Sequence, residues 1–514
     1  MTLACGKRIP DSEHAVSLSL PTLRDVIGYE EKSADVFAHI CSGYPRFVKH
    51  WTVERVQALL RERYAVDGLV VTLHDQTAAE RLMRFVGRSL EVLGGLPFGA
   101  VVLPSSDPDL VLSAQRFLQH TGCMLSSRQA EDFLGQQGVI SNLQDEPLFE
   151  GQDPARVIRT VLAGLYGVAL PQVRLYPSGM NAYFAVFDEI NRFQQAAGRR
   201  VWLQVGWLYL DTTAILDRFS AGHVHVPVSG VDALDAYLVV HRGQVAGITT
   251  EVMTNPLLET PDLVRLRAVA HRHGLPLIVD ISMPTPVNVD VLPYADVVIE
   301  SLTKFASGHA DVMGGAVVFN TQTEWGSRLS EAVCGGRPYE RDLRRLALHI
   351  QGYPERMARI NANTAALVDY FRSATGVRQV HWAGQPGSSS AYEAVRRPAG
   401  GYGGVVSVVF DKPLEQVYDG LALCKGPSFG TEFTLCMAYV YMAHYDLVTT
   451  ASGRARLQAE GIDPGLLRIS VGLEPVDELI QAFEKAQCTP PPLTDDGEGL
   501  DYNDLQHLLL YNPC

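Results

Sequence analysis

A lysine between small polar residues is the chain's clearest candidate for covalent chemistry. Lys304 closes the run Ser301-Leu302-Thr303-Lys304, directly after the apolar run VVIE. Its amine can form an imine with a carbonyl compound if its surroundings lower the pKa enough to supply free amine. The flanking hydroxyls of Ser301 and Thr303 are suited to phosphate. The glycine-rich run that follows, residues 306–315, predicts a close backbone approach to another group, which argues against an ordinary exposed loop lysine.

A second segment has the residue types of an anion-binding turn. Pro177-Ser178-Gly179-Met180 lies between the strand-like run RLY and the helical pattern NAYFAVFDEI. The first N–H groups of a helix have no partner within it, and the helix dipole favours negative charge there. This turn is therefore suited to a phosphate. The alternative is an ordinary Ser178 N-cap.

Two charged residues occupy positions where a ligand would meet them. Asp280 ends the apolar run LPLIVD, where its carboxylate could pair with a protonated pyridine nitrogen and keep the ring an electron sink. Capping of the next turn is the alternative role for Asp280. Arg468, in the β-rich run LRISVG, offers a bidentate fork for a substrate carboxylate, with a structural ion pair between domains as the alternative.

Alternating strand and helix patterns must position these residues. Apolar runs recur from residue 154 to about 325, and helical patterns such as PDLVRLRAVAHRHG separate several of them. This alternation predicts an α/β domain with a mainly parallel sheet, whose ligands gather at the carboxyl ends of the strands.

The chain divides into four predicted parts. Residues 1–155 form an N-terminal segment with extra βα units, because LVVTLHDQ and AVVLPSSD each precede a helical pattern. Residues 156–330 form the large domain, and residues 331–488 form a linking helical stretch and a smaller α/β domain. The acidic, proline-rich residues 489–514 are predicted to be a flexible tail.

Composition narrows the classes of function. There are 43 Lys and Arg against 57 Asp and Glu, so the net charge is −14, which argues against nucleic-acid and anionic-membrane partners. No apolar run is long enough to span a membrane, and the first 20 residues lack a signal-peptide pattern, so a cytoplasmic protein is expected. The eight cysteines are scattered, which favours free thiols over a metal site or disulfides.

Taken together, the motifs resemble the Cys/Met-metabolism family of enzymes that depend on pyridoxal 5′-phosphate (PLP). The resemblance covers about residues 155–488, and that family includes cystathionine γ-synthase, cystathionine lyases and O-acetylhomoserine sulfhydrylases. It rests on the order Ser178-Gly179-Met180, Glu251-x-x-Thr-Asn-Pro, Asp280, Ser301-x-Thr-Lys-x-x-x-Gly-His, and Arg468-Ile-Ser-Val-Gly. The long N-terminal segment resembles a divergent, mostly fungal branch of cystathionine γ-synthase-like proteins.

The resemblance implies a fold and a set of roles. The fold would be PLP fold type I, like aspartate aminotransferase. Lys304 would carry PLP as a Schiff base and shuttle protons, and Tyr209 would stack on the cofactor ring. Asp280 would pair with the pyridine nitrogen, with Asn255 near the ring hydroxyl. The phosphate would be held by Ser178, Gly179, Met180, Ser301 and Thr303. Arg468 would bind the substrate carboxylate, and Ser428 would support the lysine.

The sequence leaves the source of one phosphate contact open. The family takes a Tyr-x-Arg motif from the neighbouring subunit, and two segments compete for this role. Tyr44-Pro45-Arg46 has the full motif, whereas Ser126-Ser127-Arg128 lacks the tyrosine but lies nearer Ser178 and precedes a helix. Its nearness to Ser178 and the helix that follows favour Arg128. Because the central motifs supply mostly hydroxyls and N–H groups, an arginine from a partner predicts a homodimer or homotetramer.

The expected reaction is γ-replacement on an O-acylated homoserine, which joins the four-carbon unit to a thiol or another nucleophile. One departure bears on it, because Pro427 stands where γ-acting members often carry a glutamate. A PLP-dependent C–S β/γ-lyase is one alternative. A non-catalytic scaffold on the same fold is another, although the presence of Lys304, Asp280 and Arg468 argues against it.

Overall fold

A seven-stranded sheet forms the centre of the large domain. The computed structural model describes residues 3–488, and its largest sheet has the order β6-β12-β11-β10-β9-β7-β8. All neighbouring pairs are parallel except those of β12, which runs against β11 and β6. The predicted mainly parallel sheet is confirmed. The strands are β6 (Val173–Tyr176), β7 (Val201–Val205), β8 (His223–Val226), β9 (Val245–Glu251), β10 (Leu277–Asp280), β11 (Val297–Ser301) and β12 (Gly315–Phe319).

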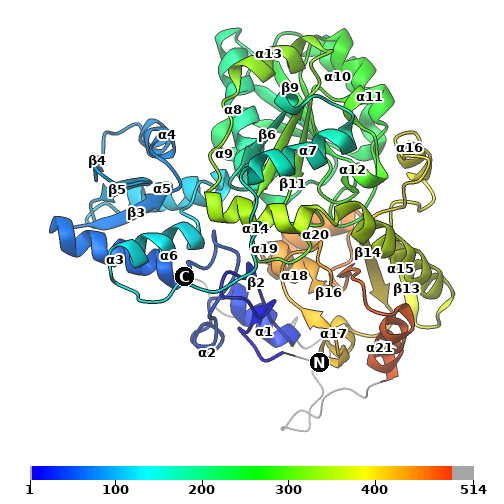
Figure 1. Cartoon of the computed structure of the whole chain (residues 1–514). Coiled ribbons are helices and arrows are strands. Elements are labelled where there is room, and N and C mark those ends of the chain that lie inside the picture. Colours follow the sequence, from blue (N-terminus) through cyan, green and yellow to red (C-terminus); the bar gives the residue numbers. More distant parts are fainter. Residues whose placement is uncertain (1–2, 489–514) are drawn as a thin grey trace.

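Helices cover both faces of this sheet, which is why its central strands are almost uniformly apolar (Figure 1). One face packs against α7 (Pro154–Tyr166), α10 (Val231–Val240), α11 (Leu263–Arg272) and α14 (Glu340–Ile350). The other packs against α8 (Gly179–Ala196), α9 (Leu210–Phe219) and α13 (Glu324–Ala332).

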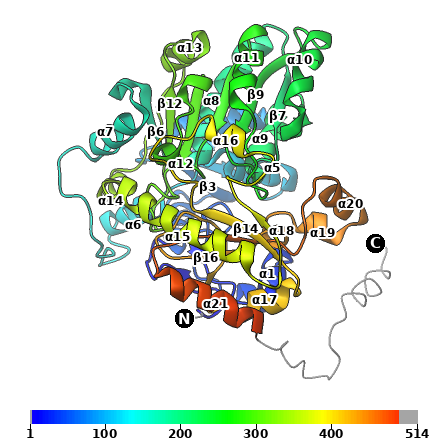
Figure 2. The ribbon, with the colours of Figure 1, turned by 90° about the vertical axis from the view of Figure 1, so that its right-hand side faces the viewer.

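The small domain has a five-stranded sheet in the order β13-β14-β17-β16-β15. Figure 2 shows α15 and α21 on its outer side. The helical stretch expected between the two domains is two helices, α14 and α15, separated at Gln351–Gly352. The elements are β13 (Val377–His381), β14 (Val405–Phe410), β15 (Cys424–Lys425), β16 (Leu435–Ala438), β17 (Leu467–Ser470), α15 (Tyr353–Ser373), α17 (Leu414–Gly420) and α21 (Val476–Cys488).

Residues 3–48 pack with this small domain, although they are far from it in sequence. Leu18, Leu20 and Val26 share a buried core with residues of β14 and α17. The N–H of Leu20 donates to the carbonyl of Lys425 at 2.9 Å. Figure 1 shows α1 (Leu23–Glu30) beside α17. The predicted N-terminal segment thus packs in two separate places, because its first apolar residues complete the core of the last domain.

Residues 51–140 form a separate lobe. Its antiparallel sheet has the order β3-β5-β4, with β3 (Leu69–Leu73), β4 (Glu91–Val92) and β5 (Gly99–Leu103). Successive side chains along β3 and β5 point to opposite faces of this sheet, and both faces are buried. One packs on α3 (Trp51–Tyr64) and α6 (Ser127–Gln136), the other on α4 (Gln76–Val86) and α5 (Pro108–Thr121). The predicted strand–helix pairs β3–α4 and β5–α5 are present.

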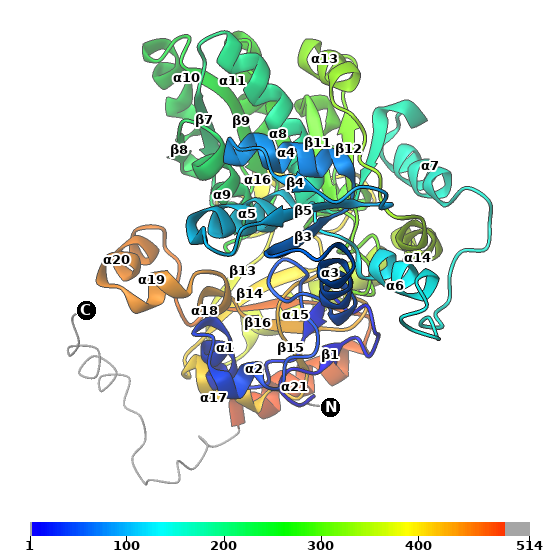
Figure 3. The same ribbon diagram turned by 90° about the vertical axis from the view of Figure 1, so that its left-hand side faces the viewer.

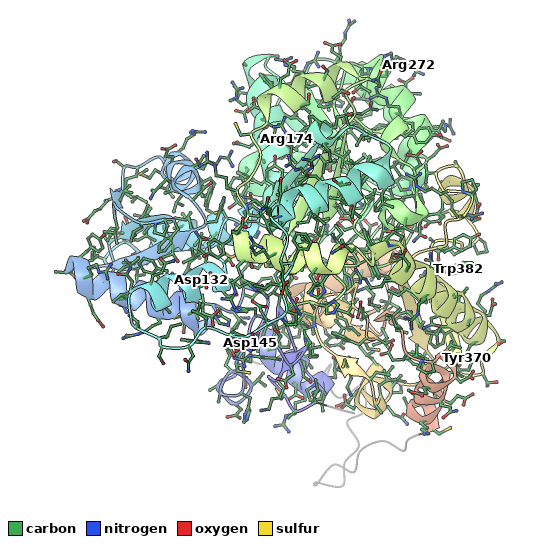
Figure 4. All side chains as sticks on the ribbon, viewed as in Figure 1. Asp132, Asp145, Arg174, Arg272, Tyr370 and Trp382 are labelled. Atoms are coloured by element: carbon green, nitrogen blue, oxygen red, sulfur yellow. The ribbon has the colours of Figure 1, made fainter. Side chains whose placement is uncertain are left out.

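Three parts are therefore distinct in the structure, with the lobe against the large domain (Figure 3). In Figure 4, Asp132 marks the lobe, Arg174 and Arg272 mark the large domain, and Tyr370 and Trp382 mark the small domain. The remaining elements are β1 (Arg8–Ile9), β2 (Ser17–Leu18), α2 (Ala34–Phe37), α12 (Thr285–Asn288), α16 (Ser389–Glu393), α18 (Tyr439–Ala443), α19 (Tyr445–Thr449) and α20 (Ala451–Ala459).

Within residues 3–488, no helix is both long and apolar enough to cross a membrane. The seven cysteines of this part are all free thiols. The predicted flexible tail, residues 489–514, lies outside the described residues.

Candidate active site

The candidate site lies where strands of the large domain end and the small domain begins. Asp280 and Ser301 are the last residues of the neighbouring parallel strands β10 and β11, and Lys304 follows three residues after Ser301. From the small domain, Ser428 and Arg468 reach the same place. The carboxyl ends of parallel strands are where ligands bind in such sheets, as the sequence predicts.

Lys304 is held by a small-domain serine. Its Nζ donates to Oγ of Ser428 at 2.7 Å and lies 4.9 Å from the ring centroids of both Tyr44 and Phe429. Burial, followed by the positive charges of Arg468 and Arg46, lowers the pKa of Lys304 to about 7. A substantial fraction of this amine is therefore neutral near pH 7, which imine formation requires.

Ser428 also holds the arginine of β17. Nη2 of Arg468 donates to the carbonyl of Ser428 at 3.0 Å, and Nη1 donates to Oδ1 of Asn255, also at 3.0 Å. The guanidinium lies 4.8 Å from the ring centroid of Tyr439, and the residue is only 4% exposed. Within the described residues its hydrogen-bond partners are the Asn255 amide, the Ser428 carbonyl and the sulfur of Met437, none of which is a carboxylate. Its charge is thus available for an anionic ligand.

Two carboxylates lie side by side at the ends of β9 and β10. Asp280 and Glu251 are register partners in the parallel pairing. Burial raises the pKa of both groups, and the charge of Asp280 raises that of Glu251 further, to well above its usual range. The N–H of Ser282 donates to Asp280 at 2.7 Å, and the N–H of Tyr209 donates to Glu251 at 2.6 Å. Each carboxylate thus has one backbone donor in a buried place.

The Ser178-Gly179-Met180 turn opens helix α8 beside the Ser301–Lys304 segment. Ser178 is the N-cap, since its hydroxyl oxygen accepts from the N–H of Asn181, and the same hydroxyl donates to the carbonyl of Gly122 at 3.0 Å. A Cβ at Gly179 would lie 2.7 Å from Cβ of Ser301, so only glycine fits. The N–H groups of Gly179 and Met180 begin the helix and have no acceptor within it.

Thr303 has a different set of partners. Its Oγ1 accepts from the N–H of Gly314 at 3.1 Å. The phenol of Tyr44 forms a side-chain hydrogen bond with Thr303. Burial raises the pKa of Tyr44 to about 12. Thr303 therefore joins the glycine-rich turn to the Tyr44-Pro45-Arg46 segment.

The Tyr44-Pro45-Arg46 segment reaches the site within its own chain. The guanidinium of Arg46 donates to the phenol oxygen of Tyr209 and forms an ion pair with Asp211. It lies 5.1 Å from the ring centroids of both Tyr44 and Tyr209. One side-chain nitrogen, Nε, is buried without a partner. An unpaired buried donor of a cation is a feature that an anionic ligand would satisfy.

Arg128, the arginine preferred from the sequence, is committed elsewhere. It forms a bidentate contact with Glu146 at 2.7 and 2.8 Å, and it also donates to Asp342 and to the carbonyl of Asp311. Arg128 is 1% exposed. Its nitrogens are occupied within this chain, so the structure brings Arg46, and not Arg128, together with the other site residues.

Several residues of the site were missed by the sequence reasoning. Asp211 and Glu251 both contact the Tyr209 region; Glu251 belongs to one of the motifs given above, whereas Asp211 belongs to none of them. Asp211, two residues after Tyr209, could have been recognised as a buried acid near a predicted site. His120 donates from Nδ1 to Asp211 at 2.9 Å, and no local pattern marks it. Phe429 and Tyr439 line the site as aromatic neighbours of Lys304 and Arg468.

The residues present fit PLP. A lysine with a lowered pKa, a buried carboxylate at a strand end, a helix N-terminus and an arginine with an orphaned Nε correspond to its aldehyde, pyridine nitrogen and phosphate. Arg468 adds a place for the carboxylate of an amino acid. The fold and the site thus have the features of a PLP enzyme that acts on amino acids.

Comparison with known proteins identifies the family. The model of the Cys/Met metabolism PLP-dependent enzymes matches residues 153–488, and the chain belongs to this family, whose cofactor is PLP. The L-2-amino-4-chloropent-4-enoate dechlorinase/desaturase of Streptantibioticus cattleyicolor is 41% identical over 492 residues, which cover 93% of this chain and 97% of that protein. Cystathionine gamma-synthase of Neurospora crassa is 28% identical, with 94% and 97% covered.

Solved structures confirm PLP fold type I. Cystathionine gamma-lyase from Lactobacillus plantarum, complexed with L-serine, has a TM-score of 0.55 at 21% identity, covering 68% of this chain and 92% of that one. Methionine gamma lyase CalE6 from Micromonospora echinospora has a TM-score of 0.53 at 24% identity, with 65% and 87% covered.

Proposed function

We propose that this protein uses PLP to expel a leaving group from Cγ of an L-α-amino acid. The observation that carries the proposal is that one serine joins the two key cations. Oγ of Ser428 accepts from Lys304, and its carbonyl accepts from Arg468. An amino acid whose carboxylate binds Arg468 would present its Cα to the lysine amine.

Each group then has a defined task. The cofactor, when bound, supplies a ring that stabilises negative charge at Cα. Asp280 would pair with the ring nitrogen, Asn255 would lie near the ring hydroxyl, and Tyr209 would stack on the ring. Arg468 would bind and orient the carboxylate. Lys304, the Schiff-base residue, would move protons at Cα and then Cβ, because its lowered pKa makes it a base near neutral pH.

The phosphate would be held by groups from three segments. The N–H groups of Gly179 and Met180, the hydroxyls of Ser301 and Thr303, and Arg46 with Tyr44 would surround it, with Ser178 as the cap of the turn. Arg46 rather than Arg128 supplies the positive charge in this proposal, because the contacts of Arg128 are already filled.

Two outcomes of this chemistry are candidates. Net elimination to an unsaturated amino acid is favoured by the 41% identity, over nearly the full chain, to a protein named a dechlorinase/desaturase, whose substrate carries chlorine at Cγ. γ-Replacement on an O-acylated homoserine by a thiol or another nucleophile is supported by several relatives named cystathionine gamma-synthase or its like.

Pro427 bears on the choice between these outcomes. A proline cannot supply the carboxylate that many γ-acting members carry there, and its carbonyl accepts from the hydroxyl of Ser17. Lys304 would therefore serve both Cα and Cβ, and the ring centroid of Tyr44, whose phenol is also titratable, lies 4.9 Å from its Nζ.

A product analysis in deuterated water tests the proposal. The PLP-loaded protein is incubated with L-2-amino-4-chloropent-4-enoate, or with O-acetylhomoserine in the presence and absence of cysteine, and products are read by mass spectrometry. Release of chloride with a product lighter by HCl supports elimination. A cysteine adduct with deuterium at Cα and Cβ supports replacement. Formation of 2-oxobutanoate alone would indicate a lyase, and a chain that neither binds PLP nor turns over substrate would be a scaffold.

The oligomeric state stays a prediction. Because Arg46 reaches the site within its own chain, a partner's arginine is no longer a reason to expect an oligomer. The homodimer or homotetramer then rests on the family resemblance alone, and light scattering should give a multiple of 56.3 kDa. A fully active species of the single-chain mass at high dilution would contradict it.

A further inference from the structure

The lobe formed by residues 51–140 touches the candidate site through one end of one helix. Helix α5 ends at Thr121, and Gly122 follows with a φ of +60°. The carbonyl of Gly122 accepts from the Ser178 hydroxyl at 3.0 Å, and that of Thr121 accepts from Nδ2 of Asn181 at 3.1 Å. The C-terminal end of α5 thus abuts the first turn of α8, and the two helix ends have opposite partial charges.

Gly122 makes this contact possible. Its φ lies in the left-handed region that favours glycine, and a Cβ there would lie 2.3 Å from Oγ of Ser178. The close approach places the N-cap of α8 between the large domain and the lobe.

His120, the residue before Thr121, is linked to Arg46 through Asp211. Nδ1 of His120 donates to Oδ1 of Asp211 at 2.9 Å, and Oδ2 of Asp211 pairs with Arg46. Asp211 is fully buried and His120 is 4% exposed. Burial, followed by the charges of Arg218, Arg46 and Arg116, lowers the pKa of His120 to about 4, so the imidazole is neutral at pH 7. Because Asp211 only accepts, the proton of the neutral ring lies on Nδ1.

We propose that His120 is a positioning residue for the PLP site: through Asp211 it fixes the guanidinium of Arg46, while the adjoining Thr121 and Gly122 fix the first turn of α8. The inference rests on the proposed function for the role of Arg46 and α8 in phosphate binding. His120, Arg46 and the whole lobe lie outside residues 153–488, which the family model covers. The proposed support for the cofactor therefore comes from residues outside the matched range.

The physical basis is the cost of an incomplete buried network. A buried carboxylate needs donors to both oxygens, and loss of one donor releases it to shift toward the other. Without His120, Asp211 would have one fixed partner instead of two. Arg46 would then be free to adopt other orientations over the Tyr209 ring, and a misplaced guanidinium binds phosphate less well.

A pair of near-isosteric variants tests this. H120N and H120L have side chains of similar shape, but only the asparagine can donate to Asp211 from the position of Nδ1. PLP is titrated into the PLP-free protein, followed by absorbance and by the near-UV circular dichroism of the bound cofactor. We expect H120N to stay within about two-fold of the unmodified protein. H120L should bind PLP about ten-fold more weakly, with altered dichroism.

A matched control separates positioning from packing. His74 is a buried histidine of the same lobe, whose Nδ1 contacts the carbonyl of Cys123 at 3.0 Å and does not touch Asp211. H74L should therefore leave PLP affinity and dichroism unchanged even where the melting temperature falls. If H120L is insoluble, H120A, which also lacks a donor, takes its place.

The outcomes are distinct from those that test the reaction, since PLP binding needs no substrate. Equal losses of affinity in H120N and H120L, or equal losses in H120L and H74L, would reduce His120 to a packing role and overturn the proposal. Unchanged affinity and dichroism in H120L would overturn it as well.

Discussion

The hydroxyl of Ser428 lies 2.7 Å from Nζ of Lys304, across the boundary between the small and large domains. Ser428 adopts a φ of +91°, which is unusual for a residue other than glycine. This conformation turns the hydroxyl to the lysine and the carbonyl to Arg468. Strained backbone at a site is worth keeping only where it positions a group, and here it positions two.

Borohydride reduction of the PLP-loaded protein should attach the pyridoxyl group to Lys304. The expectation follows from the lowered pKa of this amine, about 7, which makes it the most reactive lysine of the site. Peptide mapping by mass spectrometry locates the label. K304A should bind PLP without any covalent label, and a label on another lysine would refute the assignment.

Replacing Asp280 by asparagine should leave PLP bound but slow turnover by about 100-fold or more, because the ring would lose the partner that keeps it an electron sink. D296N is the matched control. Asp296 is a buried aspartate of the same domain that accepts hydrogen bonds from the guanidinium of Arg267 and from the N–H of Leu277. The D296N substitution should lower the melting temperature and leave kcat unchanged. Normal kcat in D280N would show that this carboxylate is only structural.

R468K should raise KM for the amino acid by about 10- to 100-fold, since a lysine cannot form the two-pronged contact to a carboxylate. PLP affinity should change little. R174K serves as control, because Arg174 donates, within residues 3–488, to the backbone carbonyls of Val333 and Ser330 and not to a residue of the site. Steady-state kinetics measure both variants, and an unchanged KM in R468K would remove Arg468 from substrate binding.

The rate at which the PLP-free protein captures PLP should rise with pH and level off above about 7. The sign follows from Lys304, whose pKa is lowered from 10.5, so that the reactive neutral amine predominates above about pH 7. R468M removes a positive neighbour and should move the midpoint upward. Absorbance after mixing, from pH 5.5 to 10, records the profile. A rate that keeps rising up to pH 10 would indicate an unperturbed lysine.

The unmodified protein should lose folding stability as the pH rises, and E300Q should abolish this pH dependence. Glu300 is buried and accepts from the phenols of Tyr166 and Tyr353, and burial raises its pKa from 4.5 to about 7. Protonation therefore favours the folded state, and this contribution is complete below pH 4.5 and lost as pH rises through 7. The loss amounts to about 3 kcal/mol. Urea unfolding of the PLP-free protein at pH 5 and pH 8.5 should show it only in the unmodified chain, and parallel behaviour of both proteins would contradict it.

The sequence was sufficient for the residues whose positions follow from local pattern. Asp280 and Lys304 stand at or just after apolar strands, and parallel strands bring their carboxyl ends together without any knowledge of long-range packing. The alternation of strands and helices likewise predicted the large sheet, because strands buried on both faces are recognisably apolar.

The choice between Arg46 and Arg128 could not be made in this way. Both are arginines in short motifs, and what separates them is the set of acids that each meets. Arg128 meets Glu146, 18 residues away, and Asp342, 214 residues away. Arg46 meets Asp211, which is 165 residues away. Such pairings depend on how the lobe and the N-terminal segment pack, which no local pattern contains.

The packing of residues 3–48 against the last domain has a consequence for synthesis. The N–H of Leu23 donates to Asp419, 396 residues further along the chain. At about 5–20 residues per second, roughly 20–80 s separate the emergence of these two partners from a ribosome. During that time apolar residues such as Leu18 and Val26, which are fully buried in the folded protein, lack the residues against which they pack. A nascent chain of this protein therefore exposes these apolar residues for most of its synthesis, and Tyr44 and Arg46 can meet Lys304 and Asp211 only after residue 304 has been made.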